Sequence, residues 1–401
     1  MPLSRRDFLA SMVGLGTLLC PCTGTTGPLP KGTFALTGTV ITGTGQHPLK
    51  NGTVLVNKGI IEAVLPEAHI TDRPVIALPD AAILPGIINA HCHRIHTREE
   101  RRDRWLAKGV TSIGDVGSTL DDMRLLAQSP TGTTATAAFC GPMIAPSGGY
   151  PTPIHKPVYA LVADTPKQGR ETVRQLEGQG ATMIKISFEP GIMPRPWPMF
   201  DADTAEAICT EARRLGLIIR CHVEDFAGLK PALDAGVNTV EHVPYRWHEK
   251  GVIRQIFNDN GELIPSYIAM LERMVRENII LTPTLDVLNR TPWKGPALFE
   301  PVRTFNAMGG RMALGNDFPY RRTDAGMPLE EMRLLACAGL SSSQIIQAAT
   351  RTSAAACNLS TRGTLAPGMA ADILVTAANP DTTMTTLEAP RHIIKDGIFI
   401  N

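Results

Sequence analysis

The sequence lacks both a long block of one charge and a repeat with the period of a solenoid. Its 401 residues carry 39 Lys and Arg against 38 Asp and Glu, so the formal net charge is only +1. This balance gives no electrostatic support for a nucleic-acid partner. The composition is otherwise that of an ordinary globular protein, with 43% hydrophobic and 19% charged residues, which argues against disorder.

A disulfide framework is also missing, although the chain has eight cysteines. Cys20 and Cys22 lie in an N-terminal leader. The others show no paired spacing typical of a disulfide scaffold or a zinc knot, and they are Cys92, Cys140, Cys209, Cys221, Cys337 and Cys357. Cys92 and Cys221 each adjoin a histidine discussed below, but strand alternation points them to the opposite face, so we expect small buried residues. No Gly-x-Ser-x-Gly motif is present, so nothing suggests a serine nucleophile.

The first 30 residues have the pattern of an export leader. Ser4-Arg-Arg-Asp-Phe-Leu9 is typical of a twin-arginine signal, and an apolar stretch over residues 9–20 follows it. That stretch is broken by two glycines and is too short to span a bilayer comfortably. We therefore expect the twin-arginine machinery to carry the folded protein to a bacterial periplasm or beyond. Thr17, Leu18 and Leu19 are poor neighbours for lipid attachment at Cys20, which argues against a lipoprotein.

Short strands with turn residues between them occur at both ends of the remaining chain. The N-terminal candidates are residues 34–40, 52–56, 60–64 and 75–78, and the C-terminal ones are 372–375 and 392–399. Neither block is large enough to form a good core alone. The sequence therefore predicts one small β-domain, a β-sandwich, built from residues 31–83 and 361–401, with a second domain inserted between them.

The inserted segment, residues 84–360, alternates between short apolar runs and helical patterns. The strand candidates are residues 86–91, 110–115, 135–140, 183–187, 217–222, 238–242, 279–284 and 311–317. Helix signatures lie between most of them, clearest at residues 168–176, 203–215 and 332–338. Eight such units predict a (β/α)8 TIM barrel, with a doubly wound sheet as the alternative.

Polar residues stand at or near the ends of several of these strands. They are His91, His93, Lys185, His222, His242 and Asp317. In a barrel of parallel strands the C-terminal ends converge on one face, which is where such barrels hold their chemistry. Imidazoles, a carboxylate and a lysine on one rim form a ligand set for a borderline metal such as zinc. A closed barrel gathers these strand ends better than an open sheet does.

Several motifs resemble those of the amidohydrolase superfamily, closest in texture to its imidazolonepropionase-like and prolidase-like branch. The similarity covers nearly the whole chain after the leader. It is carried by Leu84-Pro-Gly-Ile-Ile-Asn-Ala-His-Cys-His93, Gly109-Val-Thr, Gly315-Asn-Asp317, Ala348-Ala-Thr350, Gly363-Thr-Leu-Ala-Pro-Gly-Met-Ala-Ala-Asp372 and Ile394-Lys-Asp-Gly397. The resemblance implies the barrel and a β-domain made from both termini.

The same resemblance assigns roles to the site residues. It implies that Lys185 is carboxylated and that its carbamate bridges two divalent metal ions, zinc in the first instance. It places His222 and His242 at the fifth- and sixth-strand ligand positions, and Asp317 at the eighth. Asp317 then holds one metal, accepts a proton from the attacking water and returns it to the leaving group.

The function expected from these assignments is metal-dependent hydrolysis of amide-type C–N bonds in small molecules such as dipeptides or N-acyl amino acids. One alternative is a mononuclear deaminase or cyclic-amide hydrolase that uses His91, His93, His222 and Asp317. Such enzymes tend to place an acid three residues after the fifth-strand histidine, where Asp225 stands, with Glu224 just before it. Lactone or phosphoester hydrolysis on the same site also stays open. A metal-binding protein without catalysis is disfavoured because the whole ligand set is retained.

Substrate contacts are less clearly indicated. The segment 141–151 follows the third strand and carries Tyr150, where relatives often have histidine. Tyr245 and Arg246 follow the sixth-strand histidine and could hold a substrate carboxylate. His96 and His248 are interpreted as surface or supporting residues. The sequence leaves open whether chains associate into a homo-oligomer.

Overall fold

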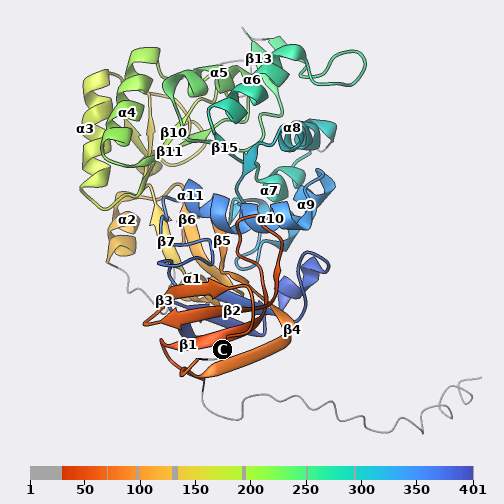
Figure 1. Cartoon of the computed structure of the whole chain (residues 1–401). Helices are drawn as coiled ribbons and strands as arrows, with labels where there is room; N and C mark the ends of the chain where they lie inside the picture. Colours follow the sequence, from red (N-terminus) through yellow and green to blue (C-terminus); the bar gives the residue numbers. More distant parts are fainter. Residues whose placement is uncertain are drawn as a thin grey trace, which may run out of the picture.

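The computed structural model describes residues 29–69, 71–95, 99–128, 134–191, 196–249, 252–292 and 295–400. Figure 1 shows a β-sheet region beside a larger region of strands and helices. The arginine pair of the leader and His96 lie outside the described residues. None of the helices in the described ranges is both long and apolar enough to cross a membrane.

The β-region is a seven-stranded sheet that joins both ends of the chain. Its order is β19-β18-β17-β4-β1-β2-β3. The strands are β1 (Phe34–Val40), β2 (Leu49–Asn57), β3 (Ile60–Leu65), β4 (Val75–Pro85), β17 (Ile373–Thr376), β18 (His392–Lys395) and β19 (Ile398–Phe399). The parallel pairing of β1 with β4, and the antiparallel pairing of β4 with β17, connect the N-terminal strands to the C-terminal ones.

This sheet curls over its own hydrophobic core. Phe34 in β1 and Phe399 in β19 stand far apart in the strand order, yet their ring centroids are only 5.2 Å apart. Buried residues of β1, β2, β17 and β18 belong to one apolar cluster, an arrangement consistent with the predicted sandwich. The sequence run 392–399 is a hairpin and not one strand, because Asp396 and Gly397 both take positive φ (49° and 76°), as a tight primed turn requires.

The larger region contains parallel strands in two sheets, β5-β6-β7 and β10-β11-β12-β15-β16. Their bounds are β5 (Ile87–Cys92), β6 (Val110–Asp115), β7 (Thr136–Phe139), β10 (Met183–Ser187), β11 (Ile218–His222), β12 (Thr239–Glu241), β15 (Ile280–Thr282) and β16 (Arg311–Met312). Both sheets follow chain order without the reversal that a doubly wound fold has. The predicted strands are therefore all present, several of them shorter than predicted.

Backbone hydrogen bonds connect the two sheets on both sides. The Ala90 N–H donates to Leu314 O at 2.7 Å beside β5 and β16, and the Thr182 N–H donates to Phe139 O at 3.0 Å beside β7 and β10. The strand pairing itself is not continuous around the ring, so a closed barrel stays a prediction. Two further pairs lie outside these sheets: β8 (Met143–Ala145) with β9 (Ala160–Val162), and β13 (Trp247–Glu249) with β14 (Val252–Arg254).

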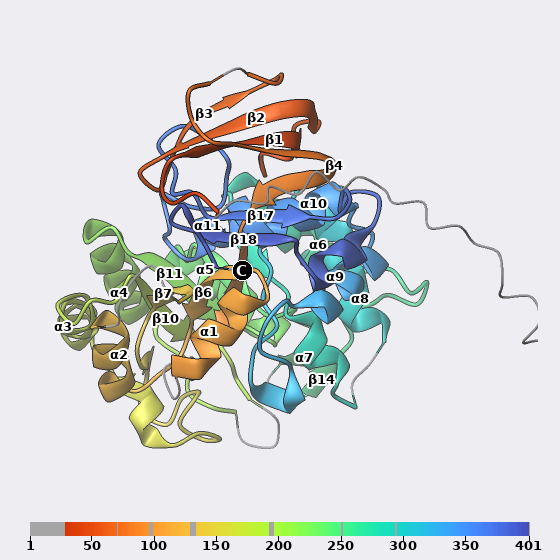
Figure 2. The same ribbon diagram turned by 90° about the horizontal axis from the view of Figure 1, so that it is seen from below.

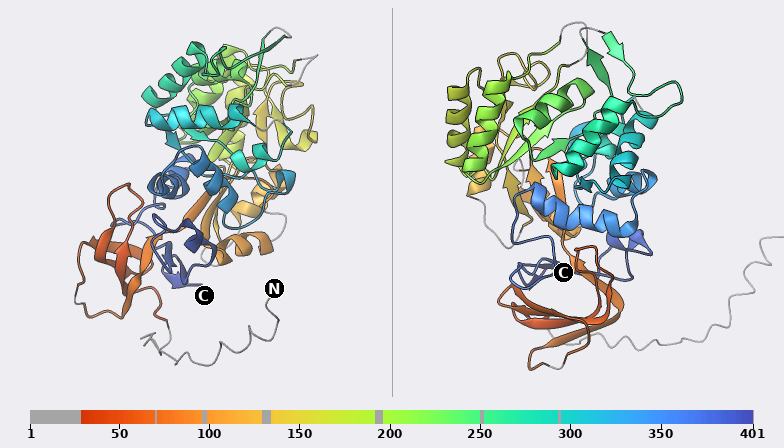
Figure 3. Two further views of the ribbon diagram at one scale, coloured as in Figure 1. Left: turned by 90° about the vertical axis from the view of Figure 1, so that its right-hand side faces the viewer. Right: turned by 45° about the horizontal axis from the view of Figure 1, so that its top comes forward.

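Helices surround the parallel strands, with α2–α4 and α7–α9 on opposite sides in Figure 2. The longer helices are α1 (Glu99–Ala107), α2 (Leu120–Ala127), α3 (Pro166–Glu177), α4 (Ala202–Arg214), α5 (Phe226–Ala235), α6 (Pro265–Arg276), α8 (Pro296–Ala307) and α9 (Leu329–Cys337). The shorter ones are η1 (Pro157–Tyr159), α7 (Leu285–Asn289), η2 (Tyr320–Arg322), α10 (Ser342–Gln347), η3 (Ala348–Thr352), α11 (Ser353–Ala356) and η4 (Met384–Glu388). The turned views in Figure 3 show α10 and α11 between the parallel strands and the curled sheet.

The predicted helices are confirmed, with small shifts at their ends. Helix α4 begins after Asp201, whose side chain accepts the Thr204 N–H at 2.8 Å. Helix α3 starts two residues earlier than predicted, because Thr165 caps it and Pro166 fits its first turn. The predicted strand 311–317 is wrong beyond Met312, since the chain leaves the sheet there and Asp317 lies on a loop.

Candidate metal centre

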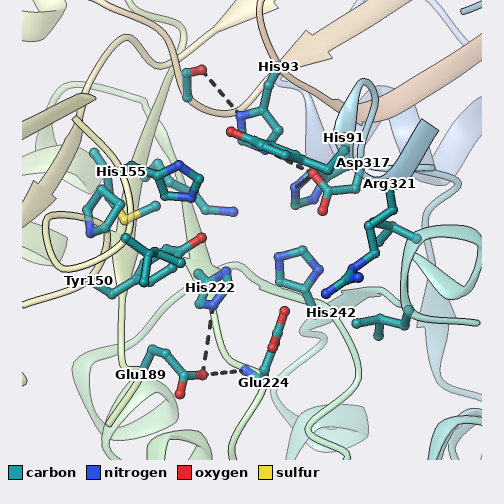
Figure 4. Close-up of a pocket in the computed structure, with 18 of the residues that line it drawn as sticks. His91, His93, Tyr150, His155, Glu189, His222, Glu224, His242, Asp317 and Arg321 are labelled. Carbon is teal, nitrogen blue, oxygen red and sulfur yellow. Dashed lines mark hydrogen bonds and ion pairs between the residues drawn. The ribbon is translucent and has the colours of Figure 1, made fainter. Parts of the chain in front are cut away.

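All the predicted metal ligands line one cavity of about 440 Å³. They are His91, His93, Lys185, His222, His242 and Asp317. Figure 4 shows histidines from separate strands facing one another across this cavity, with Asp317 beside His91 and His93. A cavity of this volume suits a small molecule, since typical ligand pockets hold roughly 300–1,000 Å³.

The four histidine rings form a continuous row. Centroid distances are 5.3 Å from His93 to His91, 4.9 Å from His91 to His242, and 4.6 Å from His242 to His222. Two groups in this row have ligand atoms close enough to share an ion: His91, His93 and Asp317, and then His222, Glu224 and His242. The side chains are therefore arranged as two adjoining trios.

Protein contacts hold one ring nitrogen of three of these histidines. The Nδ1 atom of His91 lies 2.6 Å from Glu241 Oε2, and that of His93 lies 3.2 Å from Gly117 O. The Nδ1 atom of His242 lies 2.7 Å from Thr284 Oγ1. Contacts of this kind fix ring orientation and leave Nε2 for a metal. The Nε2 atoms of His91 and His93 point at Asp317 Oδ1, at 3.4 Å and 3.0 Å.

The polar atoms that face the cavity are donor types that bind a metal cation. Among the described residues, Lys185 Nζ and His222 Nε2 are buried without a hydrogen-bond partner, and they face a cavity that His91, His93 and Asp317 also line. Buried polar atoms are normally bonded, so a cluster of unbonded ones needs an explanation. Nitrogen and carboxylate donors that converge in this way are the ligand types that zinc and similar ions take.

Three residues at successive strand ends beside the cavity have a left-handed backbone conformation. His242, Thr284 and Asp317 follow β12, β15 and β16, and their φ angles are 72°, 50° and 56°. Such left-handed conformations are uncommon for residues with a Cβ and persist where the surrounding structure enforces them. Gly315 has a different role: a Cβ there would lie 2.5 Å from that of His91, so the Gly-Asn-Asp motif allows β5 and the Asp317 loop to approach closely.

The environment of the site favours neutral bases and an ionised carboxylate. Burial lowers the pKa of His222 and of His242 well below the usual value. Burial also lowers the pKa of Lys185, whose side chain is 1% exposed, although Glu241 acts in the opposite sense. For Asp317, burial raises the pKa but contacts with His91 and His93 outweigh it and hold the pKa well below its usual range.

A fully buried ion pair lies behind the histidines. Arg220 Nε and Nη2 donate to Glu241 Oε1 and Oε2, each at 2.7 Å. Arg220 also donates to Ala356 O at 3.2 Å, which connects β11 to α11. Burial by itself raises the pKa of Glu241. The positive charges of Arg220 and Lys185 have a larger effect and hold the pKa of Glu241 well below its usual range. An ionised Glu241 can thus accept both Arg220 and the His91 Nδ1–H.

The structure separates the two acids that follow β11. Asp225 turns away from the cavity: its carboxylate accepts the Ala227 N–H and lies 2.6 Å from His248 Nδ1. Glu224 faces the cavity, and burial raises its pKa to about 7. The geometry therefore removes Asp225 from the mononuclear alternative and puts Glu224 beside His222 and His242.

The three residues predicted to contact substrate all line the cavity. Tyr150 stacks on His222 with ring centroids 4.1 Å apart. Arg246, however, is already paired, with Nη2 2.9 Å from Glu189 Oε1 and Nη1 3.0 Å from Glu224 Oε2. Its Nη1 also donates to the Tyr245 hydroxyl at 2.8 Å. The charge of Arg246 is therefore matched by protein carboxylates.

Sequence reasoning missed several residues of this site. Arg220 and Glu241 carry charge within apolar strand runs, a signal that was applied only to Lys185. Four more residues line the cavity: His155 and Trp197 come from loops, and Tyr320 and Arg321 from the single turn η2, all too short to carry a periodic pattern. Cys92 and Cys221 are free and buried, as predicted for small residues on the opposite face of their strands from the histidines.

Comparison with known proteins identifies one family and several similar hydrolases. The model of the Amidohydrolase family matches residues 82–398. The ochratoxinase of Aspergillus niger is 24% identical over 92% of this chain and 86% of its own. Among solved structures, a Xaa-Pro dipeptidase with bound methionine aligns with a TM-score of 0.74 at 19% identity, covering 92% of this chain and 99% of the dipeptidase. A putative prolidase from Bifidobacterium longum gives a TM-score of 0.73 at 26% identity over 92% and 95% of the two chains.

Proposed function

The chain belongs to the amidohydrolase family and is thus a hydrolase, and on this premise we propose that it cleaves amide bonds in small molecules with the help of divalent metal ions. The observation that carries the proposal is the buried Lys185 Nζ, which has no hydrogen-bond partner among the described residues and opens into the cavity of the four histidines and Asp317. A buried amine without a partner is costly unless it has another chemical state to adopt.

We assign two divalent ions, zinc in the first instance, to this cavity, one beside His91 and the other beside His222. His91, His93 and Asp317 would hold one ion, and His222 and His242 the other, with Lys185 shared between them. When bound, such ions supply Lewis acidity, which makes a water molecule a stronger acid and polarises a carbonyl group.

Lys185 is proposed to be carboxylated. Its neutral amine forms an N–C bond with carbon dioxide and releases one proton, so that a carbamate with one negative charge replaces the cation. Burial assists the first step, because it lowers the pKa of Lys185 and favours the neutral amine. The two oxygens of the Lys185 carbamate would then be the donor atoms in place of the amine nitrogen, and one could serve each ion.

Asp317 is proposed to move the proton during the reaction. As an ionised carboxylate next to His91 and His93, it can accept a proton from water at Oδ1 and later deliver it to the leaving nitrogen. Glu241 and Thr284 hold the rings of His91 and His242 in place throughout. Arg246 and Glu189 maintain the wall beside His222.

Three wider assignments accompany this function. The two parallel sheets are proposed to be arcs of one (β/α)8 barrel over residues 84–360, with residues 31–83 and 361–401 as the composite β-domain. The residues before 31 are proposed to be a twin-arginine leader that exports the folded enzyme. Dipeptides and N-acyl amino acids are the proposed substrates, in keeping with the dipeptidase, prolidase and ochratoxinase among the similar proteins.

Metal analysis and Lys185 variants test the proposal. We expect about two zinc ions per chain, and loss of activity on N-acyl amino acids after chelation. Lys185→Ala should lose metal and activity, and short-chain carboxylic acids should partly restore both, because they can replace the carbamate. Full metal content and activity in Lys185→Ala would refute the bridging role. A stoichiometry near one ion with an unmodified Lys185 would favour the mononuclear deaminase or cyclic-amide hydrolase.

A further inference from the structure

The short helix α7 forms part of the cavity wall and starts beside one of the candidate metal ligands. Val287 and Leu288 of this helix line the cavity. The residue before the helix is Thr284, whose Oγ1 atom lies 2.7 Å from Nδ1 of His242. The position of α7 therefore determines where this wall lies and also where the Thr284 hydroxyl meets the His242 ring.

The Thr284 side chain does not cap the helix that it precedes. A threonine at the N-cap position usually has an extended backbone and accepts the N–H two or three residues ahead of it. Thr284 instead has a φ of 50° and makes no side-chain hydrogen bond to α7, while its hydroxyl contacts His242. The first N–H groups of a helix have no partner within the helix. Those of α7 consequently need an acceptor from another part of the chain.

A glutamate from another helix provides this acceptor. Glu331 Oε2 accepts the Asp286 N–H at 2.6 Å, although 45 positions separate the two residues in the chain. This N–H is the second of α7, which a side chain at the N-cap position would ordinarily bond. Glu331 is fully buried on α9, and α9 packs against α7 (Figure 1). Helix α9 thus supplies the cap that Thr284 does not.

The surroundings of Glu331 favour an uncharged acceptor. Burial raises the pKa of Glu331 to about 8, and the negative charges of Asp286 and Glu330 act in the same direction, against a smaller opposite effect of the α7 N–H groups. The arginines of α7 and α9 are paired with other carboxylates: Arg290 with Asp286 at 2.6 Å, and Arg333 with Glu330 at 2.7 Å. Glu331 is therefore a neutral hydrogen-bonding group at neutral pH, and glutamine is its closest mimic.

We infer that Glu331 is a positioning residue for the proposed reaction: it caps α7 in place of Thr284, so that the Thr284 hydroxyl is left to orient His242 toward a metal ion. This inference rests on the proposed function, which makes His242 a metal ligand. A histidine whose Nδ1–H donates to a hydroxyl presents the lone pair of Nε2 to the metal. When the acceptor on α9 is removed, the first turn of α7 loses its cap, and Thr284 shifts with the helix that it adjoins.

Hydrogen exchange on the metal-free, full-length protein tests the cap itself. Glu331→Gln keeps an acceptor, whereas Glu331→Leu keeps a similar volume without one. Met332→Ala is the matched control, because Met332 is buried on the same helix and its truncation leaves Glu331 in place. The α7 amides should exchange about tenfold faster in Glu331→Leu alone, as loss of one hydrogen bond predicts. Exchange equal to the wild type would overturn the inference. If unfolding curves show that Glu331→Leu does not fold, Glu331→Asp, whose carboxyl is one methylene shorter, takes its place.

Zinc affinity, measured by competition with a chelator, tests the step from the cap to the ligand. Thr284→Val removes the hydroxyl and should weaken the binding of one ion by about 10- to 100-fold, and Glu331→Leu should weaken the same ion by about tenfold. Glu331→Gln and Met332→Ala should bind zinc as the wild type does. The double variant Glu331→Leu/Thr284→Val should match Thr284→Val, because no hydroxyl is left to position. Losses that add in the double variant would mean that Glu331 does not act through Thr284.

A measurement without metal separates this inference from the proposed function. In a neutral imidazole one ring nitrogen carries the proton, and nitrogen NMR of the metal-free protein shows which one, with His242→Gln to assign the signal. The wild type and Glu331→Gln should carry it on Nδ1 of His242, and Glu331→Leu should show both tautomers. That result supports the positioning role even if the protein binds no zinc and cleaves no amide, in which case the proposed function fails. Identical His242 signals in all these proteins would overturn the inference regardless of activity.

Discussion

The Nδ1 atom of His91 lies 2.6 Å from Oε2 of Glu241, although 150 positions separate the two residues in the chain. Both side chains are fully buried, and Arg220 holds the same carboxylate through two further hydrogen bonds. The contact fixes the His91 ring so that Nε2 faces Asp317. A protein carboxylate that orients a metal-binding histidine in this way also raises its basicity as a ligand.

Glu241→Gln should therefore weaken metal binding by about 10- to 100-fold, the usual effect of losing such a supporting contact. It should also reduce the free energy of unfolding by roughly 3–5 kcal/mol, because Arg220 becomes an unpaired buried cation. Competition with a chelator measures the first effect and urea denaturation measures the second. In the double variant Arg220→Met/Glu241→Gln we expect recovered stability with metal binding still weak. Metal affinity equal to the wild type in Glu241→Gln would show that the contact does not support the site.

Arg246→Met should act on the structure of the site. The substitution leaves Glu189, whose side chain is 1% exposed, without its ion-pair partner at 2.9 Å. We expect a loss of roughly 3–5 kcal/mol in unfolding free energy, and equal losses of kcat/KM on a carboxylate-bearing substrate and its amide. Adding Glu189→Gln should restore part of the stability. A rise in KM confined to the carboxylate substrate would instead support the substrate role that the sequence suggested for Arg246.

Glu331 should make the stability of the fold depend on pH. Burial raises its pKa to about 8, and its carboxylate accepts the Asp286 N–H at the start of α7 at 2.6 Å. An unfolded chain releases this proton near pH 4.3. The folded protein therefore binds more protons between about pH 4.3 and 8, so stability falls as pH rises through this window, by about 1.4 kcal/mol per unit at most.

Glu331→Gln should flatten that dependence, because it keeps an acceptor for α7 and removes the titrating group. Urea unfolding at pH 5, 6.5 and 8 measures the slope. Glu330→Gln is the matched control, since Glu330 is its neighbour on α9 and forms an ion pair with Arg333 at 2.7 Å. If Glu331→Gln keeps the wild-type slope, Glu331 is not the group responsible.

Replacement of Arg5 and Arg6 by lysine should stop export. The twin-arginine route depends on the arginine pair, so we expect the precursor to accumulate in the cytoplasm of a bacterial host. Fractionation followed by immunoblotting compares the two proteins, and a substitution of Lys31, beyond the leader, serves as the control. Continued export of the lysine variant would refute the twin-arginine route.

Local rules explain why much of this protein could be predicted from its sequence. Asp201 and Thr165 cap α4 and α3 through contacts within four residues, and such contacts are visible in the sequence itself. The apolar runs that became parallel strands needed only a periodicity to be recognised. The ligand positions followed from polar residues at the ends of those runs and from family motifs, and all of them line one cavity.

The errors occur where a tertiary contact replaces a local preference. The run 311–317 has strand-like composition, yet the Leu314 N–H is taken by Ala348 O at 3.2 Å and by Ser353 Oγ at 3.0 Å, so the strand ends early. Asp225 fits the expected spacing for a catalytic acid. Its carboxylate is instead used to cap α5 and to bind His248. Neither partner could be assigned without the fold.

The sequence by itself determined the family, the order of strands and helices, and the candidate ligands that line one cavity, because each of these depends on a motif or a short-range pattern. Tertiary structure alone decided which atoms meet, as Glu241 does with His91 and Glu189 with Arg246. The physical reason is that burial and pairing set the state of a charged group. Both are produced by segments distant in the chain, so no local pattern records them.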